Sequence, residues 1–123
     1  MARILVVDDQ PIIRIHFAQD LAEEGYHVWL ATNAAEAIAL ISSGTMFDLV
    51  VTDVDMPGAY NGLELAEFVK DVAPRTKVIV ISGGAHEREG MQAIDGFLQK
   101  PTTSRALRRH VAQALESATP VYP

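Results

Sequence analysis

Five polar side chains stand directly after apolar runs of the sequence, at the points where predicted strands end. They are Asp8, Asp9, Asp53, Ser82 and Lys100. In open α/β sheets the carboxyl ends of the strands gather at one edge, and the chemistry of such proteins is found there. We therefore expect these side chains, although far apart in the chain, to converge on a single site.

The types of these residues favour phosphoryl chemistry assisted by a divalent cation. Three carboxylates held within a few ångströms repel one another, and a cation relieves that repulsion. Mg²⁺ suits such a site, because it takes a few carboxylates together with waters and phosphate oxygens. A carboxylate oxygen of Asp53 could attack phosphorus in line and form an aspartyl phosphate. Lys100 would then neutralise charge on the phosphoryl oxygens. Ser82 could donate a hydrogen bond to one of them, and Gly83 leaves the approach open.

An alternation of strands and helices must position these side chains. The predicted strands are 4–7, 27–31, 47–52, 78–81 and a short one around 96–99. The predicted helices are 11–24, 34–42, about 62–72 and about 103–117. Nearly unbroken apolar strands indicate a sheet covered on both faces, and the alternation implies right-handed β-α-β units. The pattern predicts a doubly wound α/β domain with a parallel sheet of five strands.

Composition narrows the class of protein. The chain has 123 residues, 49% of them hydrophobic, which suits one compact domain. A formal net charge of −6 argues against nucleic acid as a partner. Cysteine is absent, which excludes disulfides and thiol catalysis. No apolar run approaches the roughly 20 residues needed to span a bilayer, and the N-terminus lacks the pattern of a signal peptide. We expect a soluble, cytoplasmic protein that does not act at a membrane.

The ordered set of motifs resembles the receiver domains of bacterial response regulators. The motifs are Asp8-Asp9, Asp53-x-x-Met56-Pro57, Ser82-Gly83 and Lys100-Pro101, and the resemblance covers residues 3 to 117. It implies a flavodoxin-like fold with strand order 2-1-3-4-5. It also implies phosphorylation of Asp53 by a histidine kinase or a His-containing phosphotransfer protein, in a Mg²⁺-dependent step.

The same resemblance assigns the remaining site residues. Asp9 and Asp53 would ligate Mg²⁺ directly, Asp8 partly through water, and Asp55 through its backbone carbonyl. Phe97 matches the aromatic residue of the receiver switch, whose rotamer follows the hydroxyl of Ser82. An aromatic side chain in a short strand can also belong simply to the core, and the sequence leaves that alternative open for Phe97.

The chain departs from the receiver pattern in two places, of which the second bears on output. The loop between Asp53 and Gly62 is one residue longer than in most receivers, and only 17 residues, 83 to 99, separate Ser82 from Lys100. We therefore predict that the fourth helix of the family is reduced to a turn or two or lost, which puts the usual dimer and output face of receivers in doubt. A homodimer is left open.

The domain is predicted to occupy residues 1–119, with 120–123 as a short tail and no output domain. The stand-alone receiver would signal by binding another protein or by relaying phosphate. It would not be an enzyme beyond accepting a phosphoryl group and slowly hydrolysing its own acyl phosphate.

Surface residues suggest where partners dock. Ile12 and Ile15 lie off the apolar stripe of helix 11–24, so we expect them to face solvent. The resemblance to receivers implies that the phosphodonor docks around this helix and the nearby loops, and we expect both isoleucines, together with Pro57 and Pro101, to help bind its helical bundle. The alternative is that one isoleucine packs against a neighbouring helix. The basic stretch from Arg105 to His110 is read as a solvated face, with an acidic partner as the alternative.

Two other functions are considered as alternatives. A Mg²⁺-dependent phosphatase with an aspartate nucleophile would use similar residues, but it usually carries its nucleophile in an Asp-x-Asp motif after the first strand. Here that strand ends in Asp8-Asp9-Gln10. A flavin-binding protein of the same topology would need a loop rich in hydroxyls and glycine at that place, where this chain has two acids.

Overall fold

The computed structural model describes residues 1–83 and 94–116, and these form a five-stranded sheet and four helices. The strands are β1 (Arg3–Val7), β2 (His27–Ala31), β3 (Leu49–Asp53), β4 (Lys77–Ser82) and β5 (Gly96–Gln99). The helices are α1 (Pro11–Glu23), α2 (Ala34–Ser42), α3 (Gly62–Val72) and α4 (Ser104–Glu116). All strand pairs are parallel, in the order β2-β1-β3-β4-β5. The predicted fold and strand order are confirmed.

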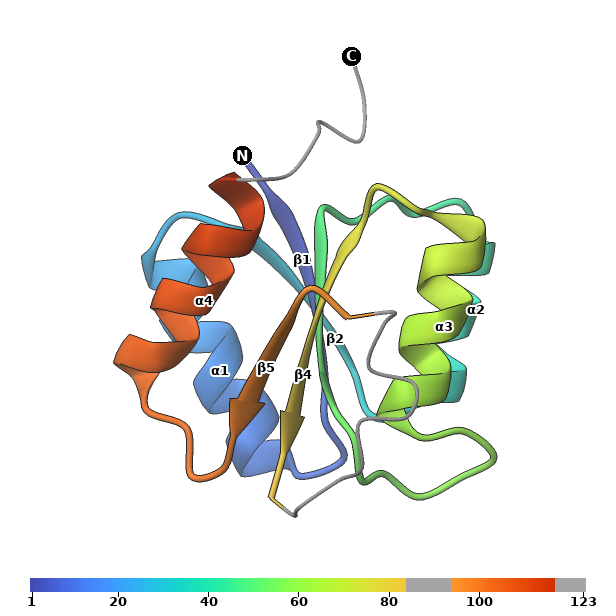
Figure 1. Ribbon diagram of the computed structural model, residues 1–123, viewed down its shortest axis with the longest axis horizontal. Coiled ribbons are helices and arrows are strands. Elements are labelled where there is room, and N and C mark those ends of the chain that lie inside the picture. Colours follow the sequence, from blue (N-terminus) through green and yellow to red (C-terminus); the bar gives the residue numbers. More distant parts are fainter. Residues whose placement is uncertain (84–93, 117–123) are drawn as a thin grey trace.

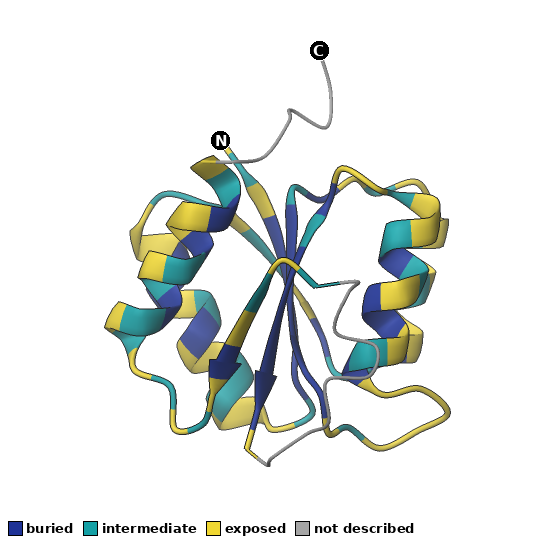
Figure 2. Cartoon of the chain, in the orientation of Figure 1, coloured by how far each residue is buried: buried dark blue, intermediate teal, exposed yellow. Residues whose placement is uncertain are grey.

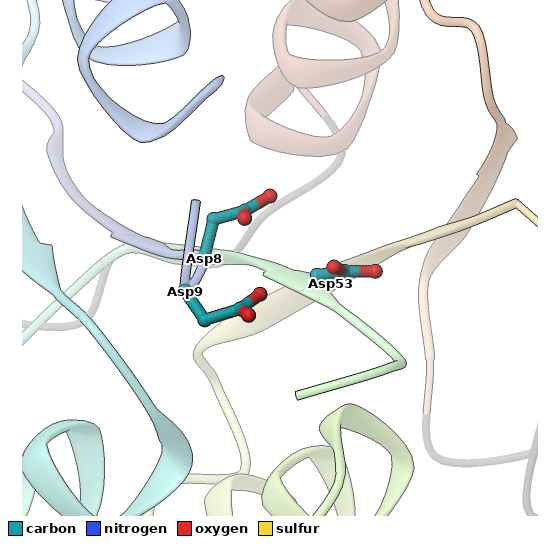
Figure 3. Close-up of side chains that lie close together, drawn as sticks. All are labelled: Asp8, Asp9 and Asp53. Atoms are coloured by element: carbon teal, nitrogen blue, oxygen red, sulfur yellow. The ribbon is translucent and has the colours of Figure 1, made fainter. Parts of the chain in front are cut away.

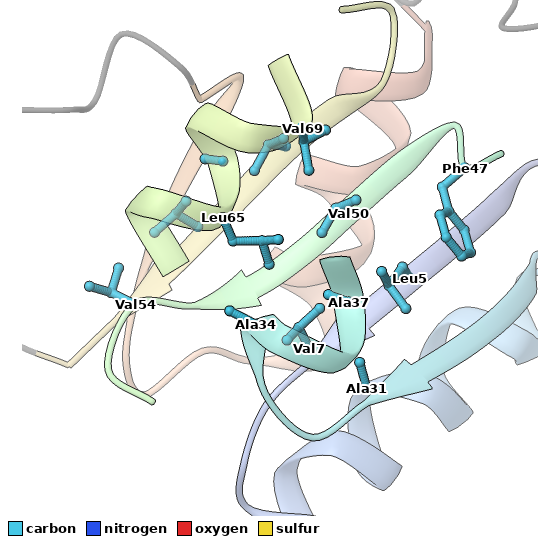
Figure 4. Packing of buried hydrophobic residues seen from close by; sticks show 13 residues of the cluster. Leu5, Val7, Ala31, Ala34, Ala37, Phe47, Val50, Val54, Leu65 and Val69 are labelled. Carbon is cyan, nitrogen blue, oxygen red and sulfur yellow. The ribbon is translucent and has the colours of Figure 1, made fainter. Parts of the chain in front are cut away.

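The sheet is covered on both faces, as the apolar strands predict (Figure 1). Helices α2 and α3 pack on one face over a cluster that includes Leu5, Val50 and Leu65 (Figure 4). Helices α1 and α4 pack on the other face, where Phe17 and Leu107 are buried. Figure 2 shows the burial concentrated in the central strands and the inner faces of the helices. Because both faces are covered, polar side chains of the central strands are confined to the strand ends.

Three of the four described helices, α2, α3 and α4, begin at a side-chain cap. Asn61 and Glu64 form a reciprocal capping box at the start of α3, with distances of 2.9 Å in both directions. Asn33 accepts a hydrogen bond from the backbone N–H of Glu36 at the start of α2. At α4 the hydroxyl of Thr103 accepts from the N–H of Ala106. Thr103 is therefore the residue that caps α4 and not its first residue, which corrects the predicted start by one position.

The third strand is shorter at its start than the apolar run predicts. Strand β3 begins at Leu49 and ends at Asp53, not 47–52. Phe47 is buried outside the strand, with its ring against Trp29 at a centroid distance of 5.6 Å. The carboxylate of Asp48 accepts a hydrogen bond from the backbone N–H of Arg3 at 2.7 Å. An apolar side chain before a strand can serve the core without sheet pairing, and the apolar run alone does not distinguish the two cases.

The prediction of a reduced fourth helix concerns residues 83–95, most of which lie outside the described residues. The predicted tail at 120–123 lies outside them as well. No helix in the described part of the chain is long and apolar enough to cross a membrane.

Candidate functional site

Three acids that are separated in the sequence meet at the carboxyl edge of the sheet (Figure 3). Asp8 and Asp9 follow β1, and Asp53 is the last residue of β3. One carboxylate oxygen from each lies within 4.8 Å of the others. Asp8 is 2% exposed and Asp53 4% exposed, while Asp9 is half-buried. The predicted convergence of the acids is confirmed.

The turn after β1 is held by its neighbours on three sides. The N–H of Asp8 donates to the carbonyl of Ala31 at the end of β2, at 3.2 Å. The N–H of Gln10 donates to the Asp8 carboxylate at 2.9 Å. The guanidinium of Arg14, on the first turn of α1, donates to the backbone carbonyl of Asp8 at 2.9 Å. These contacts fix the direction in which both acids leave the strand.

The crowding of acids affects the proton affinity of Asp8. Burial raises the pKa of the Asp8 carboxyl above its ordinary value. The hydrogen bond from Gln10 opposes this rise. The negative charge of Asp53 adds to it, and the positive charge of Lys100 opposes it. The carboxyl is thus costly to ionise where it stands, and a bound cation would relieve that cost.

The side chain of Asp53 is paired with the fifth strand. The ammonium of Lys100, directly after β5, lies 3.1 Å from Oδ2 of Asp53. The backbone N–H of Asp55 donates to Oδ1 of Asp53 at 3.3 Å. The N–H of Lys100 donates to the carbonyl of Ser82 at 2.8 Å, which holds the lysine at the end of β4. The predicted meeting of Asp53 and Lys100 is confirmed, and Ser82 ends the strand that lies between theirs.

The two residues of the predicted switch lie on the neighbouring strands β4 and β5. Ser82 is the last residue of β4 and is fully buried. Phe97 lies on β5 opposite Val80 and is 38% exposed, whereas its neighbour Leu98 is buried. Phe97 is exposed and belongs to neither of the two buried clusters among the described residues, so the alternative that it is a core residue is wrong. Leu98, which strand alternation turns to the opposite face, packs in the cluster under α1 and α4.

The predicted docking residues are at the surface. Ile12 is 84% exposed and Ile15 47% exposed, so the alternative that one of them packs against a neighbouring helix is wrong. Pro57 and Pro101 are exposed as well, and the Lys100–Pro101 peptide bond is cis.

Within the basic stretch on α4, Arg108 fits neither the predicted solvated face nor the alternative of a docking surface for an acidic partner. Its Nη2 lies 3.4 Å from the carboxylate of Asp20 and 3.1 Å from that of Glu23, both on α1. Asp20 is buried, and His16 lies 3.5 Å from it. Arg108 thus joins α4 to α1 and is neither a freely solvated residue nor a free docking residue. A partial signal existed, because Asp20 falls three residues after Phe17 on the buried stripe of α1.

Family comparison agrees with this geometry. The chain matches the model of the response regulator receiver domain over residues 4–112. It therefore belongs to the receiver domain family, a class of signalling domains of two-component systems.

Individual relatives come from bacteria and archaea. The solved structure of the response regulator TrrA from Thermotoga maritima, in complex with Mg²⁺ and beryllium fluoride, is 35% identical, with a TM-score of 0.85 over 93% of this chain and 99% of that chain. A receiver domain from Methanospirillum hungatei is 32% identical, with a TM-score of 0.87 over 94% of each chain.

Curated relatives are longer proteins. The sensor kinase/phosphatase LuxN of Vibrio campbellii is 32% identical over 94% of this chain, but the match covers only 14% of LuxN. The transcriptional regulator NtrC of Azospirillum brasilense is 35% identical over 97% of this chain and 25% of its own length. The chain thus spans a quarter or less of these two relatives.

Proposed function

We propose that this receiver domain accepts a phosphoryl group on Asp53 from the phosphohistidine of a histidine kinase or a His-containing phosphotransfer protein, with Mg²⁺ beside it. One observation carries the proposal: three carboxylates have oxygens within 4.8 Å of one another, and Lys100 lies 3.1 Å from Asp53. A divalent cation would balance the negative charge of the three acids. The cation and the lysine ammonium would together balance the charge of a phosphoryl group.

The donor set fits Mg²⁺. The carboxylates of Asp9 and Asp53, the backbone carbonyl of Asp55, and Asp8 partly through water would hold the ion. All are the hard oxygen ligands that this ion prefers. When bound, the ion supplies positive charge that neutralises the phosphoryl oxygens. The similarity to TrrA, a receiver with bound Mg²⁺ and beryllium fluoride, supports this assignment.

The residues of the chain divide the transfer between them. A carboxylate oxygen of Asp53 forms a bond to phosphorus as the bond from phosphorus to the donor's imidazole nitrogen breaks. Lys100 exchanges its contact with Asp53 for a phosphoryl oxygen. The hydroxyl of Ser82 turns to donate to another, and Phe97 follows that movement. Water later hydrolyses the acyl phosphate slowly, which releases inorganic phosphate and returns the free carboxylate of Asp53.

Partners dock on exposed residues near the site. Ile12 and Ile15 on α1, with Pro57 and Pro101 on two loops, would contact the helical bundle of the phosphodonor. Their exposure supports this role. The phosphorylated receiver would pass its signal to a downstream protein, to a second copy of itself, or onward as phosphate. The phosphatase reading has no observation in its favour.

The test is incubation with acetyl phosphate and Mg²⁺, followed by intact mass spectrometry of wild type and Asp53→Asn. Asp48→Asn serves as the matched control, because Asp48 is an acid before β3, bonded to the N–H of Arg3. A Mg²⁺-dependent gain of one phosphoryl group in wild type and Asp48→Asn, but not in Asp53→Asn, is expected. An adduct that persists in Asp53→Asn would place the acceptor elsewhere.

A further inference from the structure

The first residue of α3 lies against the backbone of the acid-bearing strand end. Gly62 is buried, and a Cβ atom placed on it would clash with the carbonyl oxygen of Asp53. The same atom would lie 2.8 Å from the carbonyl carbon of Asp53 and 2.9 Å from Cα of Val54. All three neighbours are backbone atoms, so none can turn away as a side chain could.

Position 62 requires glycine because there is no room for a side chain, and not because of its backbone conformation. Within the described residues the glycines with positive φ are Gly25, Gly44 and Gly58, and Gly62 is not among them. At Gly96 the nearest neighbour of an added Cβ would be a side-chain carbon of Ile79 at 3.2 Å, which can shift. Gly62 is thus distinguished by the rigid main chain that it meets.

Hydrogen bonds hold the two segments at this distance. The N–H of Gly62 donates to the carbonyl of Val54 at 2.9 Å, and the N–H of Val54 donates to the carbonyl of Ile81 in β4 at 3.0 Å. The hydroxyl of Thr52 donates to the carbonyl of Asp53 at 2.9 Å. The segment after Asp53 is therefore hydrogen-bonded to β4 on one side and to the start of α3 on the other.

We propose that Gly62 is a positioning residue of the acceptor site: its missing side chain lets α3 lie against the carbonyl of Asp53, which sets where Asp53 and Asp55 stand relative to Asp8, Asp9 and Lys100. This inference rests on the proposed function. Any side chain at position 62 forces α3 and the end of β3 apart, whereas Asp8 and Asp9 stay with β1. Mg²⁺ demands near-octahedral geometry at about 2.0–2.1 Å, so a small displacement of one set of ligands is costly.

The experiment compares Gly62→Ala with Val69→Ala. Val69 is fully buried on α3, two turns further along, so its truncation loosens the same helix without touching the acids. Three quantities are measured for each: the melting temperature, the dissociation constant for Mg²⁺ alone by calorimetry, and the rate of phosphoryl uptake from acetyl phosphate. If Gly62→Ala is unfolded in buffer, the measurements are repeated in trimethylamine N-oxide, which favours the compact state.

Folded Gly62→Ala is expected to bind Mg²⁺ about 10–100-fold more weakly and to take up phosphate correspondingly slowly, the range seen when groups that orient metal ligands are altered. Val69→Ala should melt earlier yet keep the wild-type Mg²⁺ affinity. Wild-type affinity in Gly62→Ala, an equal loss of affinity in Val69→Ala, or a Gly62→Ala chain that stays unfolded in the osmolyte would each overturn the inference. A wild-type protein that takes up no phosphoryl group, even from a protein donor, would instead overturn the proposed function.

Discussion

The Nζ atom of Lys100 reaches Oδ2 of Asp53 at 3.1 Å although β5 and β3 are not neighbours in the sheet. Strand β4 lies between them, and the lysine side chain crosses its end, where the backbone carbonyl of Ser82 accepts from Lys100. The contact is about three-quarters shielded from solvent on the lysine side. Lys100 therefore joins three strand ends in one site, through its side chain and its backbone N–H.

Lys100→Met tests this relationship, because methionine keeps much of the length and removes the charge. The rate of phosphoryl uptake from acetyl phosphate should fall by about 100-fold, as when one preorganised donor is removed from a site of developing charge. The melting temperature should change little by comparison. An uptake rate equal to that of wild type would show that Lys100 does not act on the phosphoryl group.

Asp8→Asn tests the cost of the crowded acids. The pKa of Asp8 is raised from 3.8 in the folded state, mainly by burial, so ionising this group opposes folding once the pH exceeds 3.8. Without Mg²⁺, the asparagine variant should melt at a higher temperature than wild type near pH 7. The difference should shrink as the pH falls and vanish once the carboxyl is protonated in both the folded and the unfolded states. Saturating Mg²⁺ should reverse the order, because wild type gains binding free energy that the variant lacks.

Thermal unfolding from pH 3 to pH 8 measures this effect, with Asp48→Asn as the control for the loss of one acid. A variant that is less stable than wild type at pH 7 without Mg²⁺ would contradict the prediction.

Arg108→Ala tests the contact between α1 and α4. Removal of the guanidinium leaves the buried Asp20 carboxylate without this partner, which should cost about 1–3 kcal/mol in the free energy of unfolding. The double variant Asp20→Leu/Arg108→Leu should recover most of that loss, since neither polar group then remains to be satisfied. Urea unfolding gives both values. Phosphoryl uptake from acetyl phosphate should stay at the wild-type rate, and an equal loss in the double variant would argue against the ion pair.

Ile12→Ser/Ile15→Ser tests the docking surface. Both side chains are exposed, so the fold should be unaffected. Transfer from a phosphorylated protein donor should slow by about tenfold, as expected when apolar anchors of an interface are removed. Uptake from acetyl phosphate, which needs no docking, should not change. Equal transfer rates from the protein donor would remove these isoleucines from the interface.

The fold and the set of acids follow from the sequence because strands buried on both faces leave an unmistakable apolar signal. Because Asp53 follows such a run, it must lie at the carboxyl end of its strand, whatever the details of packing. The caps at Asn33 and Asn61 are equally local, since each involves residues three positions apart.

The groups that support the site depend on how helices sit against strands, which local pattern does not specify. The bond from Arg14 to the Asp8 carbonyl requires the axis of α1 to be known. Gly62 reads as an ordinary first helical residue until the carbonyl of Asp53 is seen beside it. Arg108 looks like a solvated cation because its acidic partners lie 84 to 88 positions earlier in the chain.

The wide separation of the site residues in sequence has a practical consequence. Asp8 lies near one end of the chain and Lys100 near the other, with Asp53 between them, so no half of the protein can hold the acceptor site. A single cut in the chain that lets either end drift would abolish the site even if much of the secondary structure survived. Uptake of a phosphoryl group can therefore serve as a measure of how many molecules in a preparation are correctly and completely folded.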